Sequence, residues 1–146
     1  RKMKKAIVLL ATLTAMGLVH ARDEVITLPL DEVVRLGVEQ GKLDGSVTFH
    51  LSGANTPKVV ARLGEDVSNK KTNSVGKDTA TACKWAALSA LMAFQQSAKE
   101  KGANAVVDMH SFYKRNAVKD PVTFQCHDGN IVTGVALKGT YANIAK

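Results

Sequence analysis

Two cysteines, Cys83 and Cys126, are the side chains of this 146-residue chain best suited to chemistry. Cys83 falls on the apolar stripe of a predicted helix, and Cys126 falls on the apolar face of a predicted strand. Two such sulfurs predict a disulfide in an oxidising compartment, whereas two free buried thiols are expected in the cytosol. No Cys-x-x-Cys pair occurs, so a redox-active dithiol is not expected.

A metal site is the competing interpretation of the same region. His127 follows Cys126 directly, but adjacent strand residues point to opposite faces, which disfavours a joint site. Asp108 and His110 are two residues apart on one strand face and could form a surface site with His127. Transition metals usually need a more complete ligand set, so ordinary solvent-facing residues explain the three side chains better. We therefore expect no metal and no cofactor, with this trio as the alternative.

Catalytic motifs are missing from the sequence. It has no Gly-x-Ser-x-Gly, no His-Glu-x-x-His and no Gly-x-Gly-x-x-Gly. Gly76 and Lys77 are similar to the end of a phosphate-binding loop, but Lys71 and Asp78 occupy positions that need Gly and Ser or Thr. The sequence predicts a protein that is not an enzyme.

A long helix over residues 78–101 is the element that must position Cys83. Apolar side chains recur there every three or four residues, which is typical of one buried helix face. Asp78 or Thr79 is the expected N-cap, and Gly102 is a natural residue to end the helix.

A hairpin is the element that must position Cys126. Asp128-Gly129 predicts a two-residue turn, which would set Cys126 opposite Ile131. The resulting core face consists of Val122, Phe124, Cys126, Ile131, Val135 and Leu137, and the polar face of Thr123, Gln125, His127, Asn130 and Lys138.

The remaining patterns complete an α+β fold: one long helix packed on a mostly antiparallel sheet, with a short N-terminal helix. The expected elements are a helix over 31–40 capped by Asp31, strands over 46–51, 58–69, 105–113, 122–126 and 130–140, a polar loop over 69–77 and a turn over 116–121.

The amino terminus is typical of a secretory signal peptide. Four cations within residues 1–5 precede an apolar run over 6–19, and Ala21 offers a small-residue cleavage site. We expect residues 1–21 to be removed and residues 22–146 to form a single domain in the periplasm or outside the cell. An ordinary buried N-terminal helix is the alternative, and no membrane span is expected in the mature chain.

The net charge of +7 must be interpreted with that leader in mind. Without its four cations, 20 Lys and Arg against 13 Asp and Glu become 16 against 13, and the charge falls to +3. The remaining pairs Lys70-Lys71 and Lys114-Arg115 are explained by solvated loops, so no nucleic-acid partner is expected.

Three segments together resemble a family of small secreted bacterial proteins labelled "excinuclease ATPase subunit". They are Ala82-Cys83-Lys84-Trp85-Ala86, the Lys101–Val107 stretch with Gly102 and Asn104, and the ending with Cys126-His127 and Gly134–Thr140, including Gly139. The label implies nucleotide binding or DNA repair. An excision-repair ATPase needs phosphate-binding loops and zinc-binding cysteine pairs, and the sequence has neither. Trp85 lies off the helix stripe and could pack or form a recognition surface.

Residues 102–107, Gly-Ala-Asn-Ala-Val-Val after a helix, are also loosely similar to YbjQ-like domains and to the Rcs envelope-stress sensor lipoprotein. The sensor's disulfides support the pairing of Cys83 with Cys126 by analogy. No lipid-attachment Cys follows the predicted leader, so membrane anchoring does not carry over. YbjQ-like domains are sometimes described as heavy-metal-binding, but no set of residues in this sequence matches such a metal site.

Three functions follow as hypotheses. The first is an exported, non-enzymatic, disulfide-stabilised domain that contacts a protein partner in envelope stress or homeostasis. The second is a small-ligand or metal-binding module that uses Asp108, His110 and His127. The third is nucleotide or DNA-repair-related binding, as the family label implies.

Overall fold

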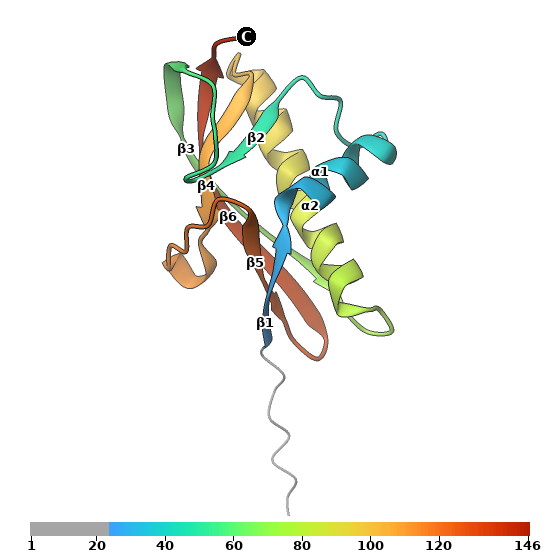
Figure 1. Cartoon of the computed structure of the whole chain (residues 1–146). Helices are drawn as coiled ribbons and strands as arrows, with labels where there is room; N and C mark the ends of the chain where they lie inside the picture. Colours follow the sequence, from blue (N-terminus) through green and yellow to red (C-terminus); the bar gives the residue numbers. More distant parts are fainter. Residues whose placement is uncertain (1–23) are drawn as a thin grey trace, which may run out of the picture.

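The computed structural model describes residues 24–146, and the predicted leader over residues 1–21 lies outside them. The described chain is α+β, with two helices and a curled, mostly antiparallel sheet (Figure 1). Its elements are β1 (Glu24–Pro29), α1 (Leu30–Glu39), β2 (Thr48–Leu51), β3 (Val59–Asn73), α2 (Thr79–Glu100), β4 (Ala105–Ser111), the short 3-10 helix η1 (Tyr113–Arg115), β5 (Thr123–Asp128) and β6 (Val132–Ile144).

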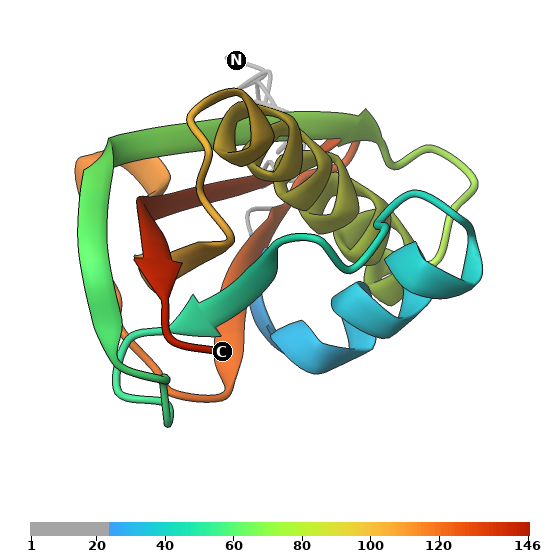
Figure 2. The ribbon, with the colours of Figure 1, turned by 90° about the horizontal axis from the view of Figure 1, so that it is seen from above.

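Strand β6 is the centre of the sheet. One of its edges pairs with β3 along nearly its whole length, and the other pairs first with β5 and then with β4. Strand β1 extends the sheet beyond β5, and β2 joins β4 as the parallel pair. In the view from above, β3 turns a corner and continues along the outside of the molecule (Figure 2).

The core lies between α2 and this sheet. Alanines line the buried face of α2, so the helix backbone can approach the strands closely. Phe94 of α2 meets Tyr141 of β6 edge-on, with ring centroids 6.1 Å apart. Asp78 caps the helix as the sequence predicts, since its carboxylate accepts the Thr81 N–H at 3.2 Å. Gly102 follows the helix with φ 71°, a conformation that favours glycine.

The predicted two-residue turn at Asp128-Gly129 is wrong. The Asp128 side chain is buried and accepts hydrogen bonds from Thr133 at 2.6 Å and Thr79 at 2.8 Å, so Asp128 stays in the strand. The turn forms over 129–132, and Asp128 pairs with Thr133. Two predicted core residues are therefore outside the core. Ile131 now lies in the turn and is 66% exposed, and Val122 precedes the start of β5 and is 58% exposed.

Other boundaries also differ from the sequence predictions. Strand β3 continues to Asn73, through residues expected to be a loop, and β1 was not anticipated at all. Strand β4 ends at Ser111 because a turn of η1 follows it. Asp31 does not cap α1, whose N-cap is Pro29, and lies instead in the first turn.

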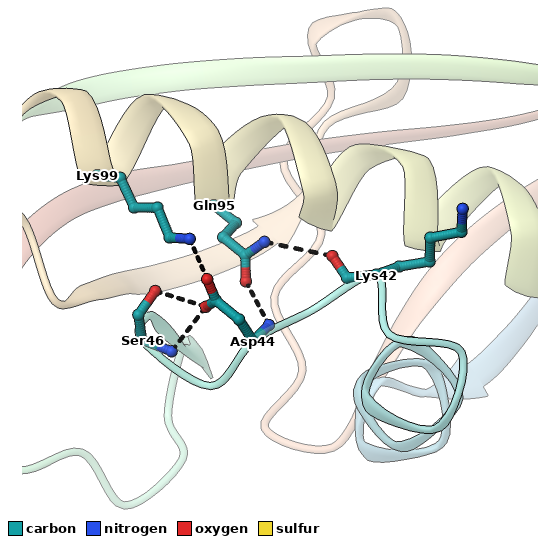
Figure 3. Close-up of polar contacts among 5 residues, drawn as sticks. All are labelled: Lys42, Asp44, Ser46, Gln95 and Lys99. Atoms are coloured by element: carbon teal, nitrogen blue, oxygen red, sulfur yellow. Dashed lines mark hydrogen bonds and ion pairs between the residues drawn. The ribbon is translucent and has the colours of Figure 1, made fainter.

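A polar network attaches the loop after α1 to α2 (Figure 3). Gln95 accepts the Asp44 N–H at 3.0 Å and donates to the Lys42 carbonyl at 3.3 Å. The Asp44 carboxylate bonds to Lys99 and accepts the Ser46 N–H at 2.9 Å. These bonds hold the pKa of Asp44 well below its ordinary value, with the Lys99 contact as the largest cause.

Candidate functional site

The disulfide predicted from the sequence is present between Cys83 of α2 and Cys126 of β5. Both residues are completely buried, and their Cα atoms are 5.8 Å apart. The bond crosses the core and ties the helix to the sheet. Its sulfurs are therefore shielded from solvent, as expected of a structural disulfide.

Backbone strain is concentrated in one short segment. Among the described residues, three that are not glycine have positive φ: Asp108 at 52°, Lys114 at 50° and Arg115 at 64°. Asp108 lies in β4, and the other two lie in the η1 turn that follows it. A left-handed conformation costs such residues about 1–2 kcal/mol each, and retained strain of this kind often marks a functional site.

Asp108 is the extra residue of a β-bulge in β4. The register with β6 shifts between Val107 and His110, which disrupts the simple alternation that the sequence suggested for Asp108 and His110. Asp108 is exposed, whereas His110 is buried.

The Asp108 carboxylate lies among hydrogen-bond donors and cations. The Ser52 hydroxyl donates to it, and Lys119 Nζ lies 3.7 Å from its Oδ1. The Ser52 bond lowers the pKa of Asp108, helped by Lys119, His110 and Arg62 and opposed by partial burial. A hollow of about 380 Å³ opens beside this carboxylate.

The structure does not bring Asp108, His110 and His127 together as metal ligands. His127 stacks on Tyr113 at a centroid distance of 3.4 Å, and His110 meets Phe112 edge-on at 6.1 Å. Within residues 24–146, no three His, Cys, Asp or Glu side chains are grouped to hold a metal ion.

Cations instead gather over aromatic rings next to the strained backbone. Lys114 Nζ lies 5.4 Å from the Tyr113 ring centroid, while Arg115 Cζ and Lys138 Nζ lie 5.6 and 5.0 Å from that of Phe112. These distances are within the range of cation–π attraction. We name this set the basic aromatic surface: Phe112, Tyr113, Lys114, Arg115, His127 and Lys138.

The basic aromatic surface has the chemistry of a recognition site. Lys114 and Arg115 are exposed, and the two rings beneath them are half-buried. Arg and aromatic residues are enriched at protein interfaces, and a guanidinium can hold a carboxylate through two parallel hydrogen bonds. The arrangement suits an acidic partner better than a proton-transfer reaction.

Sequence reasoning missed this surface. Lys114-Arg115 was interpreted as solvated loop charge, and Phe112 and Tyr113 as the end of a strand. The one available signal was the closeness of two aromatic residues to two cations in Phe112-Tyr113-Lys114-Arg115.

Three residues of the resembling segments have structural roles. Gly102 makes the turn after α2. Asn104 clamps the end of β6, accepting the Ile144 N–H at 2.8 Å and donating to its carbonyl at 3.2 Å. Gly139 is required by close packing, since a Cβ there would lie 2.6 Å from Val106 Cγ1.

Trp85 differs from these three because it is 38% exposed on α2. Its backbone carbonyl accepts a hydrogen bond from the Ser89 hydroxyl at 3.0 Å. The partly open ring leaves both sequence interpretations, packing and recognition, in place.

Neither described helix is long and apolar enough to cross a membrane. No protein-family model matches the chain, and no curated protein matches it.

Proposed function

We propose that the chain is an exported, non-enzymatic domain of the cell envelope that binds an acidic partner protein through the basic aromatic surface. Residues 22–146 form the mature domain, and its scaffold is the sheet with the long helix α2 packed on it and the shorter α1 packed against α2. One observation supports the binding role. Lys114 and Arg115 both have a left-handed backbone conformation, and their cationic groups lie near the rings of Tyr113 and Phe112.

Export is supported by two independent features. The order of charges and apolar residues at the amino terminus is that of a signal peptide. The buried Cys83–Cys126 bond belongs to chains that fold in an oxidising compartment. A role in envelope stress or homeostasis agrees with the loose similarity to the stress-sensor lipoprotein.

The mode of binding follows from the geometry of the surface. The strained backbone holds Lys114 and Arg115 outward, and the rings below limit the conformations of the cationic side chains. A side chain restrained before binding loses less conformational entropy when a partner arrives. Opposite charge on the partner would speed the encounter and make it sensitive to salt.

Site-specific photo-cross-linking in intact cells tests this proposal. A photoreactive amino acid at Asn116, an exposed residue next to Arg115 and outside the basic aromatic surface, should give one discrete cross-linked adduct in the envelope. The same amino acid at Glu39, an exposed residue of α1, should give none.

Charge reversal supplies the matched control. With the photoreactive residue at Asn116, Arg115→Glu should abolish the adduct, whereas Lys77→Glu, at an exposed cation before α2, should leave it intact. Equal adducts at positions 116 and 39, or an adduct unaffected by Arg115→Glu, would refute the assigned surface.

A further inference from the structure

The outer edge of β3 is an open strand edge. Within the described residues β3 pairs only with β6, and its regular part runs from Glu65 to Asn73 after the bulges near Gly64. An open edge presents unpaired N–H and C=O groups that can accept another strand. Strand edges of this length are normally covered by another segment or protected by charged side chains. The charges along β3 therefore bear on what could cover its edge.

The hydrogen-bond phase of β3 identifies which residues face outward. The Ser74 N–H donates to the Ile131 carbonyl at 2.9 Å, which places the even-numbered residues of β3 in bonded pairs with β6. The Phe112 N–H donates to Ala136 on the opposite edge of β6, in agreement with this phase. The backbone groups of the odd-numbered residues, such as Val67 and Asn69, therefore point to the open edge.

The charges along this edge are self-complementary. The segment reads Glu65-Asp66-Val67-Ser68-Asn69-Lys70-Lys71, with two anions and two cations at equal distances from Ser68. An antiparallel copy related by a two-fold axis at Ser68 would set Glu65 opposite the partner's Lys71 and Asp66 opposite the partner's Lys70. An axis at Val67 or Asn69 would leave all four charges opposite neutral residues. Charge thus selects one register.

We propose that two copies of this chain dock through β3 in that register, forming one antiparallel sheet across a two-fold axis at Ser68. The interface is isologous, as in most homodimers. The register also satisfies the backbone, because it pairs residues whose N–H and C=O groups point to the open edge in both copies. Val67 pairs with the partner's Asn69, and Glu65 pairs with the partner's Lys71.

Ser68 provides an independent argument for this axis. It is 7% exposed, and among the described residues its hydroxyl has no hydrogen-bond partner. A buried hydroxyl left without a partner is unfavourable. At the axis Ser68 faces the partner's Ser68 in a non-hydrogen-bonded pair, where Cα atoms are about 4.5 Å apart. The Ser68 hydroxyl is covered in the single chain, so it must turn toward the partner before one hydroxyl can donate to the other.

The intramolecular contacts of the acidic residues are compatible with docking. Glu65 lies 3.5 Å from Lys138, but its side chain is 66% exposed and can also reach a second cation. Asp66 accepts the Tyr141 hydroxyl at 2.7 Å through Oδ2 and the Val67 N–H at 2.8 Å through Oδ1. On docking, the Val67 N–H would bond to the partner's Asn69 instead, which would free Oδ1 for the partner's Lys70. Docking leaves the Lys138 and Tyr141 contacts in place and replaces only the bond from the Val67 N–H.

A charge swap tests the proposal on the full chain with its native disulfide, using sedimentation velocity at micromolar concentrations. The wild-type chain should sediment as a dimer. An acidic variant (Lys70→Glu with Lys71→Glu) and a basic variant (Glu65→Lys with Asp66→Lys) should each be monomers. An equimolar mixture should form a heterodimer, because all four charge pairs are then opposite. Lys58→Glu with Lys77→Glu, away from the edge, should remain dimeric.

The outcomes that overturn the proposal are clear. A monomeric wild-type chain, variants that stay dimeric, or a mixture that stays monomeric would each contradict it. Far-UV circular dichroism checks that each variant is folded.

Cysteine cross-linking tests the axis without altering charge. Ser68→Cys should form a covalent dimer on mild oxidation, since the two Cα atoms fall within disulfide range. Asn69→Cys should not, because the proposed register sets Asn69 opposite the partner's Val67. Equal cross-linking of both variants, or none with Ser68→Cys, contradicts the register. The open edge is distinct from the basic aromatic surface, so failure here leaves the proposed function standing.

Discussion

Cys83 of α2 and Cys126 of β5 are 43 residues apart in the chain and share one buried disulfide. The bond joins the main helix to the edge of the sheet that also holds β1. Much of the fold's resistance to unfolding should therefore depend on the oxidation state of the protein.

Removal of the disulfide should destabilise the chain strongly. Cys83→Ala with Cys126→Ala should lower the free energy of unfolding by about 4 kcal/mol, because the unfolded chain regains the freedom of a long closed loop. Urea unfolding with and without reductant measures this. Reductant should weaken the wild-type chain by a similar amount and leave the variant unchanged. A wild-type chain indifferent to reductant would contradict the expectation.

Gly139 and Gly134 should respond differently to the same substitution. A Cβ at Gly139 would lie 2.6 Å from Val106 Cγ1 and 3.1 Å from Met109 Cγ, so Gly139→Ala should cost about 1–3 kcal/mol of unfolding free energy. At Gly134 the nearest atoms are 3.7 Å away, and Gly134→Ala should be neutral or stabilising by up to about 1 kcal/mol. Thermal unfolding of both variants gives the comparison. Equal losses would argue against close packing of β6 under β4.

Strain at Lys114 should be released by glycine. Lys114 has φ 50°, so Lys114→Gly should raise the free energy of unfolding by up to about 1 kcal/mol. Asn116, two residues later, has φ −96°, and Asn116→Gly should lower it by about 0.5–1 kcal/mol. Chemical denaturation distinguishes the two. A loss at Lys114→Gly as large as at Asn116→Gly would show that the left-handed conformation is not strained.

The Asp44 network should make stability dependent on acid. The pKa of Asp44 in the folded chain lies below its ordinary value of 3.8, mainly because of Lys99. Its contribution is therefore present above about pH 4 and is lost as the pH falls below that value. The stability difference between wild type and Asp44→Asn should shrink over this range and also with added salt. Glu39→Gln, at an exposed carboxylate of α1, is the control. A difference independent of pH would contradict the role of the carboxylate charge.

Parts of the fold follow from local sequence signals. Periodic apolar residues and the Asp78 cap define α2, and the same periodicity puts Cys83 in the core. The alternation around Cys126 places it on the buried face even though the turn was wrong. The predicted and observed registers differ by two positions on each strand, and an even shift leaves the facing of side chains unchanged.

Other parts depend on tertiary contacts that leave little local trace. The segment Asn69–Asn73 is polar and was interpreted as a loop, but backbone pairing with β6 makes it a strand. The buried Asp128 is held in β5 by Thr79, which is 49 residues away, and by Thr133, which is five residues away on the next strand. These hydrogen bonds override the local turn preference.

The candidate site was the least predictable feature. Left-handed φ values at Lys114 and Arg115 occur without glycine, asparagine or aspartate, the residues that most readily adopt them, and only Asp108 is of such a type. The stacking of His127 on Tyr113 joins β5 to η1 and requires the fold to be known. The metal trio was proposed from strand alternation, which the bulge at Asp108 interrupts.

The most direct test of an exported, disulfide-stabilised domain is the intact mass of the protein recovered from cells after alkylation without reductant. The account predicts a chain that begins at Arg22, lacks residues 1–21, carries no alkyl group and is two hydrogens lighter than its reduced form. A chain that retains residues 1–21 and carries alkyl groups on both Cys83 and Cys126 would contradict it.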